Sequence, residues 1–196
     1  MIVRRFVVPV LAATMLVAAC KKDPPPPPAP TVNEDSIARA RADSIRAARE
    51  AAEAAAAEEA ARREAAARER AVAAARATLE EMVFFDYDMS DIRSDAEAIL
   101  RAKAEILRAS PQVQLRIEGH ADDRGSTEYN LALGNRRAEA VRAFLAGFGL
   151  SEARFNIVSY GEERPLATGS NESSWARNRR GQFVITAGAN AINPSN

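Results

Sequence analysis

The feature that most constrains this chain of 196 residues lies between Glu34 and Glu81, where no glycine and no proline occurs. The segment is mostly alanine, arginine and glutamate, which are strong helix formers. Opposite charges recur at the i, i+4 spacing that stabilises a helix, as in Glu58 with Arg62, Glu59 with Arg63, and Glu64 with Arg68. The segment 34–81 is therefore predicted to be one long helix of roughly 70 Å, at about 1.5 Å per residue.

The bulky apolar residues of this segment are few and scattered: Ile37, Ile45, Val72 and Leu79. They form no heptad seam, so a single solvated helix is favoured over a coiled coil. The alternative is a partly disordered, charge-rich tether. In either form the segment 34–81 is expected to act as a spacer.

Residues 1–19 have the pattern of a signal peptide: a positive start at Arg4 and Arg5, then an apolar run too short to span a bilayer. Small residues precede Cys20, and the string LVAAC resembles the lipobox of bacterial lipoproteins. That resemblance implies that Cys20 carries lipid, and Lys21 after it favours the outer membrane. A cleaved, soluble secreted protein is the alternative. The proline-rich remainder of the segment 20–33 favours a stiff polyproline II linker.

From Met82 onward the pattern is that of a folded domain, predicted over residues 82–187. Strands are expected at 82–85, 113–117, 155–160 and 182–186, and helices at 94–109, 127–148 and, in a short form, 175–180. Ser94 and Glu97 have the spacing of a capping box at the first helix. Strands that alternate with helices predict the α/β class, as a two-layer α+β sandwich with helices packed on a mixed four-stranded sheet. The tail 188–196 is expected to be disordered.

The densest polar stretch is GHADDRGSTEYN, residues 119–130, between a predicted strand and a predicted helix. Ligand sites are common at the carboxyl ends of strands in such folds, although Asp122 and Asp123 also suit a simple turn. Arg137 borders the apolar stripe of the next helix, where by itself it would be a snorkelling arginine. Together, Asp122 and Arg137 have the charges to bind the ammonium and the carboxylate of a small zwitterion.

The stretch EGHADDRGSTEYNLALGNRRAEAVRAFL, with VFFDYDMSDIRSD before it and IVSYGEERP and NRR after it, resembles the peptidoglycan-associated lipoproteins of the OmpA-like family. The resemblance covers about residues 82–185 and implies noncovalent binding of the peptidoglycan stem peptide through meso-diaminopimelate. By position it implies six ligand-binding residues: Asp122, Arg137, Asp88, Tyr87, Asn130 and Leu133. Arg179 and Arg180, in the string NRR, are assigned first to holding the final strand and loop.

Other function classes are disfavoured. The 27 basic and 27 acidic residues give no net charge, so nucleic acid is not expected as a partner. One cysteine and one histidine do not supply a catalytic zinc site, and no nucleophile elbow or phosphate loop occurs, so no cofactor, no metal and no enzymatic activity are expected. The competing ideas are a cell-wall hydrolase built around His120 and a purely structural spacer. The resemblance also suggests TolB and other Tol proteins as partners, although the long helix is not part of it.

Overall fold

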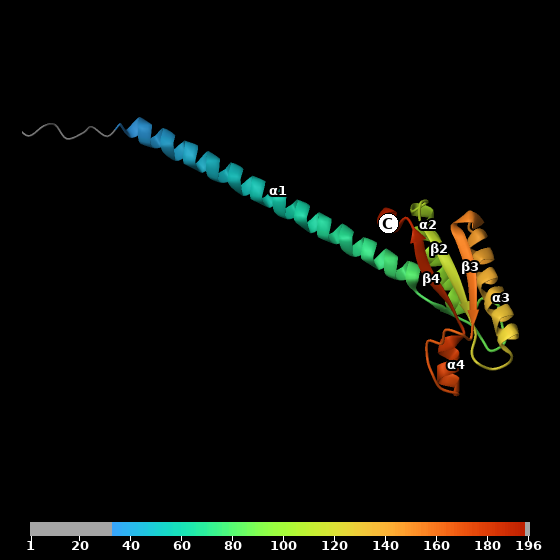
Figure 1. The fold of residues 1–196 in the computed structure, drawn as a ribbon. Coiled ribbons are helices and arrows are strands. Elements are labelled where there is room, and N and C mark those ends of the chain that lie inside the picture. The colour runs from blue at the N-terminus through green and yellow to red at the C-terminus, as the bar shows by residue number, and fades with distance from the viewer. Residues whose placement is uncertain (1–32, 195–196) are drawn as a thin grey trace, which may run out of the picture. The chain divides into compact units, whose positions relative to one another are not determined.

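The structure is a computed structural model that describes residues 33–194. The predictions for the signal peptide, for Cys20 and for nearly all of the proline-rich linker lie outside the described residues. The elements, in chain order, are α1 (Glu34–Glu80), β1 (Val83–Phe84), α2 (Ser94–Ala109), β2 (Gln114–His120), α3 (Thr127–Ala146), η1 (Glu152–Arg154), β3 (Phe155–Gly161), α4 (Glu172–Asn178), β4 (Arg180–Ala187) and η2 (Ala189–Ala191) (Figure 1).

The long helix predicted from composition is present as α1, a helix of 47 residues. Two compact units of the chain meet within it, after Ala52. In the first unit the side chains of the helix are exposed, and Asp43 pairs with Arg46. In the second unit the helix is exposed as far as its last turns, where Ala75 and Leu79 are buried. The helix is therefore not solvated along its whole length, because its final turns carry apolar residues that pack into the domain core.

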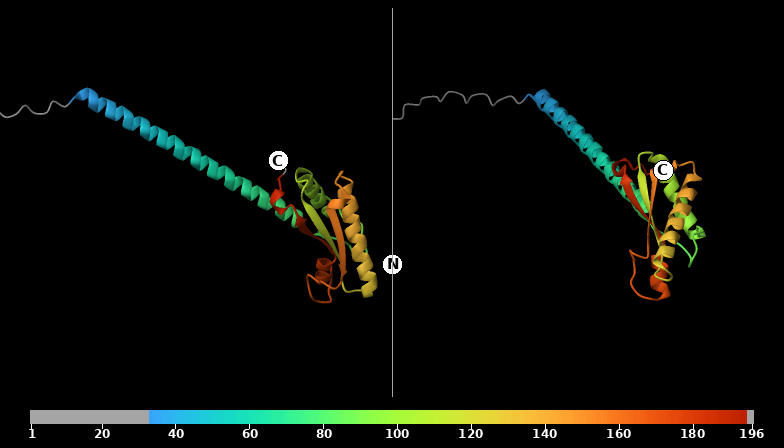
Figure 2. Two further views of the ribbon diagram at one scale, coloured as in Figure 1. Left: turned by 45° about the horizontal axis from the view of Figure 1, so that its top comes forward. Right: turned by 45° about the vertical axis from the view of Figure 1, so that its right-hand side comes forward.

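The domain is a mixed four-stranded sheet in the order β1-β4-β2-β3. Strand β4 is antiparallel to both β1 and β2, with Ile117 opposite Phe183, whereas β2 and β3 are parallel, with Ile117 beside Ile157. Helices α2 and α3 lie on the same side of the sheet, and two further views show α3 running beside β3 (Figures 1 and 2). The predicted two-layer α/β fold is confirmed. In the first helix, however, the predicted capping box is absent, because Ser94 is already helical and the N-cap position belongs to Arg93.

The core lies between the sheet and the helices and holds alternate residues of the strands, such as Leu115, Ile117 and Phe183. Helix α3 approaches β2 closely where Gly119 meets Gly134. A Cβ atom at Gly119 would lie 1.8 Å from the Gly134 carbonyl oxygen, which no side chain can tolerate. This contact of two glycines places the first half of α3 directly beside the carboxyl end of β2.

The C-terminal segment corrects the expectation of disorder from residue 188. Gly188, at a φ of 73°, turns the chain into η2, and Ile192 is only 6% exposed within the core. The Asn193 backbone N–H donates to Ser110 Oγ at 2.8 Å. The sequence after Gly188 is short and carries one bulky apolar residue, which gives too little periodicity to predict this docking.

Substitution of Ile192 by aspartate should lower the free energy of unfolding by at least about 2 kcal/mol, because it puts a charge in a core position. The matched control is Ile37→Asp, since Ile37 is 40% exposed on α1. Thermal unfolding followed by circular dichroism measures both. Equal effects of the two variants would mean that the tail does not belong to the core.

Candidate functional site

Four chain segments converge at one end of the sheet. Because β1, β2 and β3 run in one direction and β4 runs against them, the loops after the first three strands and the segment before β4 meet at the same edge. At this edge the loops after β1 and β2, together with the first half of α3, surround a small cavity of about 100 Å³. Its lining residues are Tyr87, Asp88, Asp122, Arg124, Gly125, Tyr129, Asn130, Leu133 and Arg137. All six residues predicted as ligand-binding thus border one pocket.

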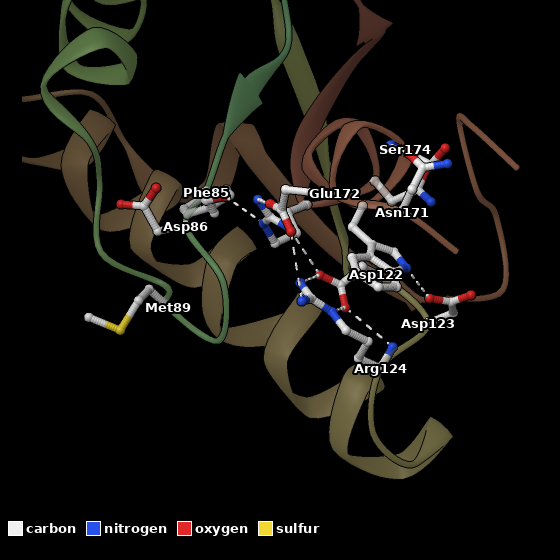
Figure 3. Close-up of polar contacts among 12 residues, drawn as sticks. Phe85, Asp86, Met89, Asp122, Asp123, Arg124, Asn171, Glu172 and Ser174 are labelled. Atoms are coloured by element: carbon white, nitrogen blue, oxygen red, sulfur yellow. Dashed lines mark hydrogen bonds and ion pairs between the residues drawn. The ribbon is translucent and has the colours of Figure 1, made fainter. Parts of the chain in front are cut away.

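Asp122 follows β2 directly and is 4% exposed. Its carboxylate accepts hydrogen bonds from Arg124 Nη2 at 2.7 Å and Nε at 3.0 Å, from the Arg124 backbone N–H at 3.2 Å, and from Arg179 Nη1 at 3.2 Å (Figure 3). Burial raises the pKa of Asp122, but the hydrogen bonds from Arg124 and Arg179 outweigh burial and hold the pKa below its usual range. The pocket therefore contains a fixed, ionised carboxylate.

Arg124, which the sequence did not single out, is stacked between two aromatic rings. Its Cζ atom lies 3.9 Å from the centroid of the Tyr87 ring and 4.1 Å from the Trp175 ring. Guanidinium groups stack well on aromatic faces, so the side chain is held flat while it pairs with Asp122. Asp123 accepts a hydrogen bond from Trp175 Nε1 at 2.6 Å and so fixes one of these rings (Figure 3). Asp122 and Asp123 thus do more than form a turn.

Glu172 of α4 completes a ring of alternating charges with the residues just described. Its carboxylate pairs with Arg179 Nη2 at 2.7 Å and lies 3.8 Å from Arg124 Nη1. Arg179 also donates to the Phe85 carbonyl oxygen at 3.0 Å. The role expected for Arg179, holding the end of the chain in place, is therefore present, and in addition Arg179 touches the central carboxylate. Arg180 is the first residue of β4 and donates to the Arg164 carbonyl oxygen at 3.2 Å.

Arg137 is fully buried, which rules out the snorkelling alternative. Its guanidinium donates to three backbone carbonyl oxygens: Met89 at 2.9 Å, His120 at 2.7 Å and Asp86 at 3.0 Å. Burial lowers the pKa of Arg137 to about 10, so the group is still charged at neutral pH. Arg137 lines the pocket without an ion pair to Asp122 among the contacts of the described chain, and three of its five N–H donors hold the backbone. In this structure Arg137 therefore holds together the backbone segments around the pocket.

The remaining predicted residues shape the mouth and floor of the pocket. Asp88 has a φ of 57°, in the left-handed region, and its carboxylate accepts a hydrogen bond from the Tyr129 hydroxyl. Asn130 is 1% exposed and donates to the Arg124 carbonyl oxygen at 3.2 Å and to Glu162 at 2.5 Å. Leu133 is buried, whereas Tyr87 is 57% exposed. A strained backbone at Asp88 is typical of functional loops.

Three residues that border the pocket were missed: Arg124, Gly125 and Tyr129. Arg124 and Gly125 belong to the polar stretch that was identified as a whole, and Tyr129 directly precedes Asn130 on the first turn of α3. A helical projection of that turn would have placed Tyr129 near the strand end. The stacking of Arg124 had no signal in the sequence, because Trp175 is far away along the chain.

Neither a metal site nor a membrane-spanning helix is found within residues 33–194. No group of three potential ligands among His, Cys, Asp and Glu lies together there. None of the described helices combines the length and the apolar character needed to cross a bilayer. His120 is buried, and burial together with the charges of Arg180 and Arg164 lowers its pKa to about 3.

Known proteins share this domain. The OmpA family model matches residues 84–179. The peptidoglycan-associated lipoprotein of Brucella melitensis is 49% identical over 105 residues, which are 54% of this chain and 62% of that protein. The protein of the same name from Pseudomonas aeruginosa is 50% identical over 97 residues, 50% of this chain and 57% of that protein. The match thus covers less than two thirds of these curated relatives.

The solved structure of the peptidoglycan-associated lipoprotein from Burkholderia pseudomallei is also similar. It is 43% identical and superposes with a TM-score of 0.53, over 55% of this chain and 91% of that one. Nearly the whole solved domain therefore has a counterpart here. This chain belongs to the OmpA family, in which the peptidoglycan-associated lipoproteins are its relatives.

Proposed function

We propose that this chain is an envelope lipoprotein that binds peptidoglycan noncovalently, through the free amino-acid end of meso-diaminopimelate in the stem peptide. The observation that carries the proposal is the charge balance of the pocket. Two carboxylates, Asp88 and Asp122, and two guanidinium groups, Arg124 and Arg137, line the same small cavity. A zwitterion has the same balance and can bind without leaving an unpaired charge in a buried place.

Each part of such a ligand has a counterpart in the pocket. The ammonium group would bind Asp122 and Asp88, and the carboxylate would bind Arg124 and the free N–H groups of Arg137. Leu133 and the ring of Tyr87 offer apolar surface to the methylene chain. Asn130 holds the loop that carries Arg124 and so keeps the two charges of Asp122 and Arg124 in place. The relatives are named peptidoglycan-associated lipoproteins, which supports peptidoglycan as the polymer that is bound.

The anchor and the partners belong to the same proposal. Cys20 would carry the lipid and hold the chain on the outer membrane, facing the periplasm, so that the pocket tethers that membrane to the wall. Membership of the Tol-Pal system, with TolB as a partner, would follow from the relationship to the peptidoglycan-associated lipoproteins. The alternative is an OmpA-like lipoprotein outside that system which acts as a structural spacer, and the long helix α1 favours it.

The first test is co-sedimentation of the chain with purified diaminopimelate-type peptidoglycan. Replacement of Asp122 by asparagine should weaken binding by more than tenfold, because a buried, hydrogen-bonded charge pair contributes about 2–5 kcal/mol. The control is Asp91→Asn, which removes a charge from an exposed residue outside the pocket. Undiminished binding by a folded Asp122→Asn chain would place the binding surface elsewhere, and no binding by the wild type would refute the ligand.

Arg137 should behave differently from Asp122. Replacement of Arg137 by alanine removes the donors of three backbone carbonyl oxygens, at about 1–3 kcal/mol each when buried. We expect a loss of about 3–5 kcal/mol in the free energy of unfolding, measured by urea denaturation. Asp122→Asn serves as the comparison and should lose less. A stable Arg137→Ala chain that fails to bind peptidoglycan would instead assign Arg137 to the ligand alone.

The competing function is a cell-wall hydrolase. The buried His120, whose pKa is about 3, is a poor general base at neutral pH, which supports a binding protein. The purified chain should release no soluble fragments from peptidoglycan during prolonged incubation, analysed by reversed-phase chromatography. Release that persists, and that a chelator or the His120→Gln substitution abolishes, would establish the enzyme.

A further inference from the structure

The C-terminal end of α1 has no basic side chain of its own to cap it. The last four carbonyl groups of any helix have no intrahelical partner, and the negative end of the helix dipole favours a nearby cation. The last turn of α1 contains no basic residue; the helix ends at one glutamate, Glu80, and a second, Glu81, follows it. By its own sequence this end should fray.

Lys103, from the middle of α2, supplies the missing cap. Its Nζ atom donates to the carbonyl oxygens of Thr78 at 2.6 Å, Leu79 at 2.9 Å and Glu81 at 2.6 Å. An ammonium group has three N–H donors, and here three acceptors surround it. The side chain is fully buried, and Nζ lies 4.0 Å from the centroid of the Phe183 ring of β4.

The charges that act on Lys103 come from α1 and the residue after it. Burial lowers the pKa of Lys103 to about 7, while Glu81 and Glu80 act in the opposite direction. Beside the ammonium, Leu79 and Ala75 of α1 are buried in the core. Arg76 of α1 adds a contact to the C-terminal segment, where its Nη2 atom donates to the Ala189 carbonyl oxygen at 3.3 Å.

We propose that Lys103 is a latch that fixes the last turns of α1 to the α/β domain, so that this end of the spacer opens only when Lys103 releases its three carbonyl groups. A force applied to α1 would then be transmitted to the domain through Lys103 and Leu79. The two residues between α1 and β1, Glu81 and Met82, would not act as a free hinge. The latch lies away from the pocket residues and does not depend on the proposed ligand.

Amide hydrogen exchange of the full chain tests the latch. In the wild type the amides of residues 77–81 should be protected nearly as well as those of α3. Lys103→Met keeps the length of the side chain and removes its donors, and it should raise opening of 77–81 at least tenfold more than opening of α3. The control is Arg101→Met on the exposed face of α2, which should raise neither. If Lys103→Met accelerated amide exchange equally in residues 77–81 and in α3, Lys103 would be an ordinary core residue and not a latch.

The wild type alone provides a second measurement, should Lys103→Met fail to fold. After correction for intrinsic exchange, the amides of residues 77–81 should exchange much more slowly than those of residues 53–65, which lie in the exposed part of the same helix. Exchange at 77–81 that is as fast as at 53–65 would overturn the latch.

Discussion

The buried guanidinium of Arg137 is the interaction on which the geometry of the site depends. It joins the loop after β1, through the carbonyl groups of Asp86 and Met89, to the end of β2, through that of His120. These two segments carry Asp88 and Asp122, the two carboxylates of the pocket. Without that cation the three carbonyl oxygens would lose their shared donor, and the two acids would lose their common frame.

Two other cationic side chains of the domain also bind several backbone carbonyl groups at once. Lys103 binds three carbonyl groups at the end of α1, and Arg154 binds those of Leu107, Ser110 and Val113 where α2 ends and β2 approaches. In each case a cation from a distant part of the chain binds backbone carbonyl oxygens at the end of an element. Long side chains with several donors suit this task, because one group satisfies several backbone oxygens at once. These cations add to backbone hydrogen bonds within the same turns, such as the one from the Ser110 N–H to the Leu107 carbonyl oxygen at 3.3 Å.

Much of the fold was predictable because its signals are local. Period-2 and period-3.6 patterns located the strands and helices to within a few residues, and the lack of glycine and proline located α1. Two of the six candidate residues, Asp122 and Arg137, were indicated by their charges and positions, and the family resemblance added the other four. The structure gathers all six around one pocket, and their role in binding stays a prediction. The parts that could not be predicted rest on contacts between distant residues: Arg124 with Trp175, Lys103 with Leu79, and Ile192 with the core. Gly188 was taken as the end of the fold, whereas it turns the chain back toward Gln112.

The position of Trp175 has an optical consequence. It is the one tryptophan of the chain, its ring lies against Arg124, and its N–H group is bound by Asp123. Indole emission responds to a neighbouring cation and to the polarity around the ring. All of the intrinsic tryptophan fluorescence of this protein therefore originates next to the pocket. A ligand that shifts Arg124 changes the wavelength or the intensity of this emission, and no added label is needed.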